Sequence, residues 1–351
     1  MAAPLIDWDL AVRLGTRLAG DGPTVSREEA RDVVAELRED AARSARLVRD
    51  HTGLEAPENT APVLVVDRAG WVQANADSFA TVLAPLVTAL ETRRSPTGLT
   101  RAIGSRVTGA EAGALLGFLA GKVLGQFDPF HTGAERGTSE AGRLLLVAPN
   151  IVHVERELGA VPGDFRLWVC LHEETHRVQF TAVPWLRDHL FSEVQALADT
   201  LGGADVAALL DDGLKRVTEL VRGGTGSIID VVSTPEQRAI LDRVTGLMSL
   251  LEGHADVVMD GVGPSVIPSV DAIRRKFTQR RQGVGTLDRL LRRLLGLDAK
   301  MAQYRDGAVF VRTVVDRVGM ERFNAVFAEP AHLPSLAEIH DPPAWIGRVL
   351  G

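Results

Sequence analysis

Cysteine is nearly absent from this sequence. The 351 residues include a single one, Cys170, so the chain cannot form an internal disulfide framework. A lone thiol in an otherwise cysteine-free chain fits a reducing compartment better than secretion. The N-terminal segment carries Asp7 and Asp9, where a secretory signal would have basic residues followed by an apolar stretch. We therefore expect a cytoplasmic protein in which Cys170 is a core residue.

Long hydrophobic runs are absent as well. The most membrane-like stretch, residues 112–121, is about half as long as a bilayer-spanning helix, and Lys122 ends it. Positive charge is not in excess, because 39 Lys and Arg residues stand against 46 Asp and Glu residues, a net charge of −7. This balance excludes a surface that coats nucleic acid or anionic lipid as a whole. We expect no membrane and no nucleic acid as partners, and the sequence leaves the oligomeric state open.

Helix signals are present along most of the chain. Residues Ser26–Glu29 form a capping box, and Thr234–Gln237 combine an N-cap, a proline at the first helical position and a capping glutamine. Asp164 is the expected N-cap of another helix. Short apolar runs at 63–66 and 144–148 predict strands. The sequence thus predicts a mainly α fold with at most a few short strands.

Glycines recur every four residues in one predicted helix. They are Gly109, Gly113, Gly117, Gly121 and Gly125. Residues at this spacing lie on one helix face, where a partner backbone can approach closely. Each interior glycine costs roughly 1 kcal/mol relative to alanine, so the pattern indicates a packing role. We expect tight helix packing in a core, with a membrane contact or a subunit contact as the alternatives.

The run His172-Glu173-Glu174-Thr175-His176 has the spacing of a zinc site. On an α-helix, residues four apart point within about 40° of each other and lie about 6 Å apart along the axis. His172 and His176 would therefore present two imidazoles to one point, as zinc requires. Glu173 would lie beside the metal, where a carboxylate can accept a proton from water and deliver it to a leaving group. The apolar residues on both sides predict a buried helix, in which such polar groups need partners or a metal.

A catalytic zinc site uses three protein ligands, and the best candidate for the third is Glu252. Glu252 and Asp256 are four residues apart and share a helix face, so Asp256 can accept a hydrogen bond from the second nitrogen of a ligand histidine. His254 is the alternative ligand. It lies about 200° around the helix from Glu252, and both could face the metal only if the helix broke at Gly253. Tyr304, the only tyrosine, is a candidate for stabilising the oxyanion, with a purely structural role as the alternative.

These residues carry a resemblance to known enzymes. With His172, Glu173, His176, Glu252 and Asp256 in place, the sequence resembles the gluzincin branch of zinc metallopeptidases. More closely, it resembles a family of actinobacterial zincin-like hydrolases that are labelled as associated with deazaflavin coenzyme biosynthesis. The segments that carry this second resemblance are 123–128, 171–180, 252–255, 258–260 and 295–304.

The resemblance implies a mainly helical zincin-like fold with zinc as the cofactor, and it says little about the substrate. From the sequence we expect an N-terminal helical segment over residues 1–60 and a zincin-like catalytic domain over 61–351, or one continuous domain. The charged residues Glu174 and Arg177 depart from the zincin pattern, in which uncharged residues are usual. We expect a zinc-dependent hydrolase, a metallopeptidase whose partner is a peptide or a small amide substrate.

Three alternatives remain open at this point. The same zinc and Glu173 would serve an amidase or deacylase that acts on a small molecule. A non-catalytic zincin scaffold could keep the metal for structure or bind a partner, although it would have no use for Glu173. Nucleic-acid binding would use a basic stretch that contains one aromatic residue, Phe277, so a solvated helix face or an acidic substrate is the better interpretation. That stretch comprises Arg274, Arg275, Lys276, Arg280, Arg281, Arg289, Arg292, Arg293 and Lys300.

Overall fold

The computed structural model describes residues 4–57, 60–85, 87–88, 98–131, 142–200, 234–282 and 297–351. The chain forms two compact units, which are interleaved along the sequence. The first unit comprises residues 1–187 and 259–274, and the second comprises residues 188–258 and 275–351.

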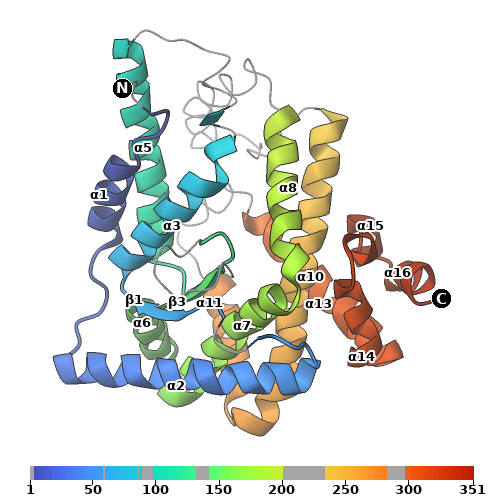
Figure 1. Cartoon of the computed structure of the whole chain (residues 1–351). Helices are drawn as coiled ribbons and strands as arrows, with labels where there is room; N and C mark the ends of the chain where they lie inside the picture. The colour runs from blue at the N-terminus through green and yellow to red at the C-terminus, as the bar shows by residue number, and fades with distance from the viewer. Residues whose placement is uncertain are drawn as a thin grey trace. The chain divides into compact units, whose positions relative to one another are not determined.

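Helices dominate both units, which confirms the predicted mainly α fold (Figure 1). The helices that lie within the first unit are α1 (Trp8–Ala19), α2 (Arg27–Thr52), α3 (Arg68–Val82), α5 (Gly98–Ala120), α6 (Ala148–Leu158) and α7 (Pro162–Ala182). The helices that contribute residues to both units are α8 (Pro184–Thr200), α10 (Pro235–Val266) and α11 (Val270–Gln282). The second unit also holds α13 (Leu297–Val318), α14 (Met320–Phe323), α15 (Leu336–Ile339), α16 (Pro342–Val349) and 3-10 turns at Asn324–Phe327 and Pro330–His332.

A small sheet lies in the first unit. Its strands are β1 (Val63–Val66), β2 (Gly125–Asp128) and β3 (Arg143–Val147), in the order β1-β3-β2. The central strand β3 is buried along its whole length and pairs parallel with β1 and antiparallel with β2. The two predicted strands are therefore confirmed within a residue, whereas β2 was not predicted. Its position at the edge of the sheet brings it against α7.

The recurring glycines pack α5 tightly against α1, which confirms the core interpretation. A Cβ at Gly113 would come 2.7 Å from the carbonyl oxygen of Ala11, and one at Gly117 would come 2.8 Å from the carbonyl oxygen of Gly15. Only glycine allows the two backbones to lie this close. The glycine pattern in the sequence, however, continues beyond the end of the helix. Helix α5 ends at Ala120, and Gly125 opens β2, so the predicted glycine helix is too long.

Local capping signals located most helix starts correctly. Helix α2 begins directly after Ser26, whose hydroxyl accepts a hydrogen bond from the backbone N–H of Glu29. Helix α10 begins after Thr234, whose hydroxyl accepts from the backbone N–H of Gln237 while the Gln237 side chain accepts from the N–H of Thr234. The prediction for α7 is wrong. This helix begins at Pro162, and the carboxylate of Asp164 instead accepts a hydrogen bond from the backbone N–H of Ser269.

In the second unit, α10 and α13 cross at two glycines. A Cβ on Gly253 would overlap the backbone of Gly307, and a Cβ on Gly307 would overlap the carbonyl of Ser249. Helix α13 starts at Leu297 and ends before Gly319, whose φ of 81° is left-handed. Within the described part of the chain, no helix is long and apolar enough to cross a membrane.

Candidate metal centre

Helix α7 carries the histidine motif without interruption. Pro162 supplies the favoured first residue, and the helix ends at Ala182, just before Pro184. The apolar residues ahead of the motif are buried, so the helix is held in the core of the first unit. This places His172 and His176 one turn apart. Their rings stand at 89° to each other with centroids 4.8 Å apart, and their Nε2 atoms are 3.3 Å apart.

The separation of the two Nε2 atoms fits a shared metal ion. Two nitrogens bound at about 2.0–2.1 Å to a tetrahedral zinc lie about 3.3 Å apart. The distance of 3.3 Å between the Nε2 atoms of His172 and His176 matches that value. Both rings are partly exposed rather than sealed in the core, so an ion and a substrate could reach them.

The second nitrogen of His176 has its own partner. Nδ1 lies 3.0 Å from Oε1 of Gln179, which is fully buried on the next turn of α7. An amide oxygen accepts a hydrogen bond, so Nδ1 carries the proton and Nε2 keeps its lone pair for a metal. Sequence reasoning missed this residue, although the spacing of three residues on one helix could have indicated it.

Glu173 is held between the motif helix and the sheet. Its side chain is buried, with 7% of its surface exposed, and it lies against the backbone of Gly125 on β2. A Cβ at Gly125 would come within 2.5 Å of Cγ and 2.9 Å of Oε1 of Glu173. Glycine at the start of β2 therefore leaves the space that this carboxylate occupies.

One group of described side chains could hold a metal ion, and it consists of His172, His176 and Glu252. His172 and His176 belong to the first unit, whereas Glu252 belongs to the second. Two nitrogens and one carboxylate oxygen form the donor set of a catalytic zinc site, which leaves a fourth position for water or substrate.

The remaining candidates for the site are His254, Asp256 and Tyr304. His254 is completely buried in the second unit, where its ring stacks on Phe323 at 5.5 Å and meets Phe327 edge-on. Helix α10 runs unbroken through Gly253, so His254 and Glu252 cannot share a face. Asp256 lies one turn after Glu252 on α10, and its role stays a prediction. Tyr304 lies on α13, but its side chain is outside the described residues.

Comparisons with known proteins agree with this geometry. A family model described as zincin-like metallopeptidase matches residues 6–346. The chain belongs to the zincin-like metallopeptidase family. Its sequence is 33% identical to that of a candidate hydrolase with a novel fold from Chloroflexus aurantiacus, whose crystal structure superposes with a TM-score of 0.70 over 98% of both chains. No protein of curated function matches it.

The two charges that are unusual for a zincin lie on the back of the motif helix. Glu174 is fully buried, and its Oε2 accepts a hydrogen bond of 2.6 Å from Nε of Arg177. Burial raises the pKa of Glu174 to about 7, although the positive charge of Arg177 acts to lower it. At 100° per residue, both side chains point well away from the face that carries His172 and His176. They therefore lie outside the metal-binding face of α7.

The single cysteine of this zincin-like chain takes no part in the site. Cys170 is fully buried on α7, where its Sγ lies 3.7 Å from the carbonyl oxygen of Leu37 on α2. Burial raises the pKa of the thiol well above its ordinary value. The core role predicted for Cys170 is confirmed.

Proposed function

We propose that this zincin-like protein is a zinc-dependent hydrolase of the gluzincin type, and that it cleaves amide bonds in peptides. His172, His176 and Glu252 are the proposed ligands. The observation that carries the proposal is the 3.3 Å separation of the two histidine Nε2 atoms, and Glu252 is the described carboxylate that could complete the ligand set. A purely structural zinc site would be closed by four protein ligands, whereas this set has three.

The residues around the ligands supply the remaining functions. When bound, zinc supplies a Lewis acid that polarises the scissile carbonyl and acidifies a water molecule. Glu173 accepts the proton of the attacking water and delivers it to the leaving nitrogen. Gln179 fixes the tautomer of His176, and Asp256 is proposed to do the same for His172. Tyr304 remains the candidate that stabilises the oxyanion.

The position of β2 favours a peptide over a small amide. Among the described strands, β2 has a hydrogen-bonded neighbour on one side only, and its first residue lies against Glu173. An extended peptide can add to the open edge of a sheet through main-chain hydrogen bonds. A substrate bound in this way would run past the proposed general base. The resemblance to a coenzyme-associated family adds nothing about the substrate, and we propose no activity on that coenzyme.

The test compares Glu173→Gln with wild-type protein. A fluorescent peptide library and a set of acyl amides identify a substrate for the wild type, with and without a chelator. Glu173→Gln keeps the shape of the side chain but removes the proton acceptor, so we expect hydrolysis to fall by at least about 10²-fold and zinc content to stay unchanged. Glu111→Gln, at an exposed position on α5, is the matched control and should retain full activity.

Three outcomes would contradict parts of the proposal. Equal activity of wild type and Glu173→Gln would place the general base elsewhere. Chelator-sensitive cleavage of acyl amides, without cleavage of any peptide, would indicate a small-molecule amidase or deacylase. No chelator-sensitive hydrolysis in either screen would favour a non-catalytic scaffold.

A further inference from the structure

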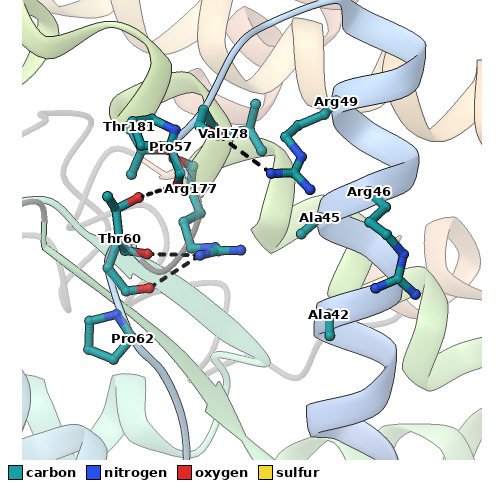
Figure 2. A pocket seen from close by; sticks show the side chains of 12 residues that line it. Ala42, Ala45, Arg46, Arg49, Pro57, Thr60, Pro62, Arg177, Val178 and Thr181 are labelled. Carbon is teal, nitrogen blue, oxygen red and sulfur yellow. Dashed lines mark hydrogen bonds between the residues drawn. The ribbon is translucent and has the colours of Figure 1, made fainter.

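A cavity in the first unit lies on the side of the motif helix that faces away from His172 and His176. It is an open cavity of about 440 Å³ between the second half of α2, residues 56, 57 and 60–62, and the end of α7 (Figure 2). Helix α7 contributes Arg177, Val178 and Thr181. These residues lie roughly on the opposite side of α7 from His172 and His176, because each residue advances about 100° around the helix. The cavity is therefore separate from the candidate metal centre.

The charged side chains that line the cavity are all arginines, and one of them, Arg177, is paired with the buried Glu174. Arg46 and Arg49 face the cavity from α2, and Arg177 faces it from α7 (Figure 2). None of the described residues that line it is acidic. Arg46 and Arg49 are neighbours on one helix, so their like charges repel each other. This positive group stands out because the whole chain carries a net charge of −7. Such a concave positive wall attracts anions.

The arginine from α7 is fixed in position. Its Nη1 donates to the carbonyl oxygens of Thr60 at 2.9 Å and Ala61 at 3.4 Å, while its Nε donates to Glu174. Ala61 has a φ of 50°, in the left-handed region that alanine rarely adopts. A strained residue of this kind persists where the surrounding contacts hold it, and it is often found next to a binding site. The guanidinium of Arg177 is thus preorganised, which reduces the entropy lost on binding.

Apart from Thr60 and Thr181, most of the remaining wall is apolar. The apolar members are the small side chains of Ala42, Ala45, Ala56, Pro57, Pro62 and Val178. Ala42, Ala45, Arg46 and Arg49 follow one another at helical spacing, so the apolar and charged parts of the α2 wall form one face. A ligand that fits this surface has a charged end and a short hydrocarbon part.

We propose that the cavity binds a small organic anion, whose carboxylate or phosphate group contacts Arg46, Arg49 and Arg177 and whose apolar part packs on the alanine and proline side chains. Arginine suits this role because its planar guanidinium can donate two parallel hydrogen bonds to either oxyanion. In Arg177, Nε and Nη1 already have partners, so this arginine would contact the anion through Nη2. The binding site is independent of the hydrolysis proposed above, since none of its contacts involves the proposed ligands or Glu173.

Isothermal titration calorimetry of the full chain at low salt tests the proposal. The probes are hexanoate and hexyl phosphate, which share a tail and differ in the oxyanion, and orthophosphate, which lacks the tail. We expect one of the two tailed anions to bind once per chain and at least about tenfold more tightly than orthophosphate. Arg46→Gln and Arg49→Gln should each weaken that binding about tenfold or more, because each removes a charged hydrogen-bond donor. Arg38→Gln, at an exposed α2 position outside the cavity, should leave it unchanged.

Controls separate the cavity from other anion sites. His172→Ala should bind the anion as tightly as wild type, since an anion held by a metal ion would be lost with the ligand. Thermal unfolding of each variant checks that it folds. If Arg49→Gln fails to fold, Arg46→Gln decides the result, because Arg46 is solvent-exposed and its substitution should not disturb folding. The proposal would be overturned if neither tailed anion bound. It would also be overturned if Arg38→Gln lost as much affinity as the cavity variants, or if His172→Ala lost affinity for the anion.

Discussion

Gly125 and Glu173 are in direct contact, although they belong to different secondary structures. The absence of a side chain at Gly125 leaves room for the carboxylate arm of Glu173, which would be 2.5 Å from a Cβ at that position. The proposed general base can thus pack against the edge strand β2 only because residue 125 has no Cβ.

The first prediction follows from this contact. Gly125→Ala should displace the Glu173 carboxylate and reduce kcat/KM by about 10- to 100-fold, because a misplacement of about 1 Å at a reacting group has a cost of this size. Zinc content should not change, since neither residue is a proposed ligand. Hydrolysis of the substrate found in the peptide screen and metal analysis measure the two effects.

The control for this prediction is Gly104→Ala. A Cβ at Gly104 meets nothing within 4 Å, and the residue lies inside α5, so alanine there should be neutral or stabilise the protein by up to about 1 kcal/mol. Full activity of Gly125→Ala would show that Glu173 can move without loss, which would argue against its role as the base.

The second prediction concerns the third zinc ligand. The protein as purified with sufficient zinc should contain about one zinc ion per chain, and Glu252→Ala should lose it, as should His172→Ala. His254→Ala should keep the metal but lower the free energy of unfolding by about 2–4 kcal/mol, because it opens a cavity between Phe323 and Phe327. Elemental analysis and denaturant unfolding measure these quantities.

A second substitution at position 254 distinguishes the loss of a zinc ligand from the loss of zinc through unfolding. His254→Phe keeps an aromatic ring in the same stack, so it should fold and retain zinc. If His254→Phe releases the metal while Glu252→Ala keeps it, the proposed ligand set is wrong.

The third prediction concerns the crossing of α10 and α13. Gly307→Ala should lower the free energy of unfolding by about 1–3 kcal/mol, because its methyl group would overlap the backbone carbonyl of Ser249, which cannot rotate aside. Gly347→Ala on α16 is the matched control, since a Cβ there meets nothing within 4 Å. Denaturant titration of the two variants should separate them clearly, and equal stability would mean that the helices move apart without cost.

The fourth prediction is a pH dependence of stability. Burial raises the pKa of Asp40 on α2 from 3.8 to about 6, and the negative charge of Glu36 adds to the effect. Between these two pH values the folded protein holds a proton that the unfolded chain has released. The free energy of unfolding therefore decreases as the pH rises from about 4 to about 6, and it stays lower above that range.

Asp40→Asn removes this titration. Relative to wild type, the variant should gain about 1 kcal/mol between pH 4 and pH 7, a value reduced from the full shift because the carboxylate is only half-buried and solvent screens it. Glu39→Gln, an exposed neighbour on the same helix, should show no such pH-dependent gain. Parallel curves for wild type and Asp40→Asn across this range would contradict the predicted pKa of the carboxyl group.

The features that the sequence predicted well depend on local spacing. The start of α10 follows from Thr234 and Gln237, which are three residues apart, and the pairing of His172 with His176 follows from one helical turn. In each case the interacting groups are close together on one element, so the helical period alone determines their geometry.

The features that were missed depend on contacts between distant segments. Asp164 has the chemistry of an N-cap, but its carboxylate binds the backbone of Ser269 far along the chain. Gly125 fits a helical glycine pattern, yet it opens a strand because β3 offers hydrogen-bond partners there. Local propensity favours one outcome at each position, and tertiary contacts decide another. The role of Glu252 depends on such a contact as well, and it stays a prediction.

The burial of Cys170 has a practical consequence for spectroscopy. Thiol-directed labels react with the thiolate, and in this protein burial keeps the one native thiol both protonated and inaccessible. Maleimide dyes and nitroxide spin labels should therefore leave the folded native chain unmodified. Two cysteines introduced at exposed positions would carry the only probes, so the distance between them could be measured by electron resonance or fluorescence without first removing the native residue.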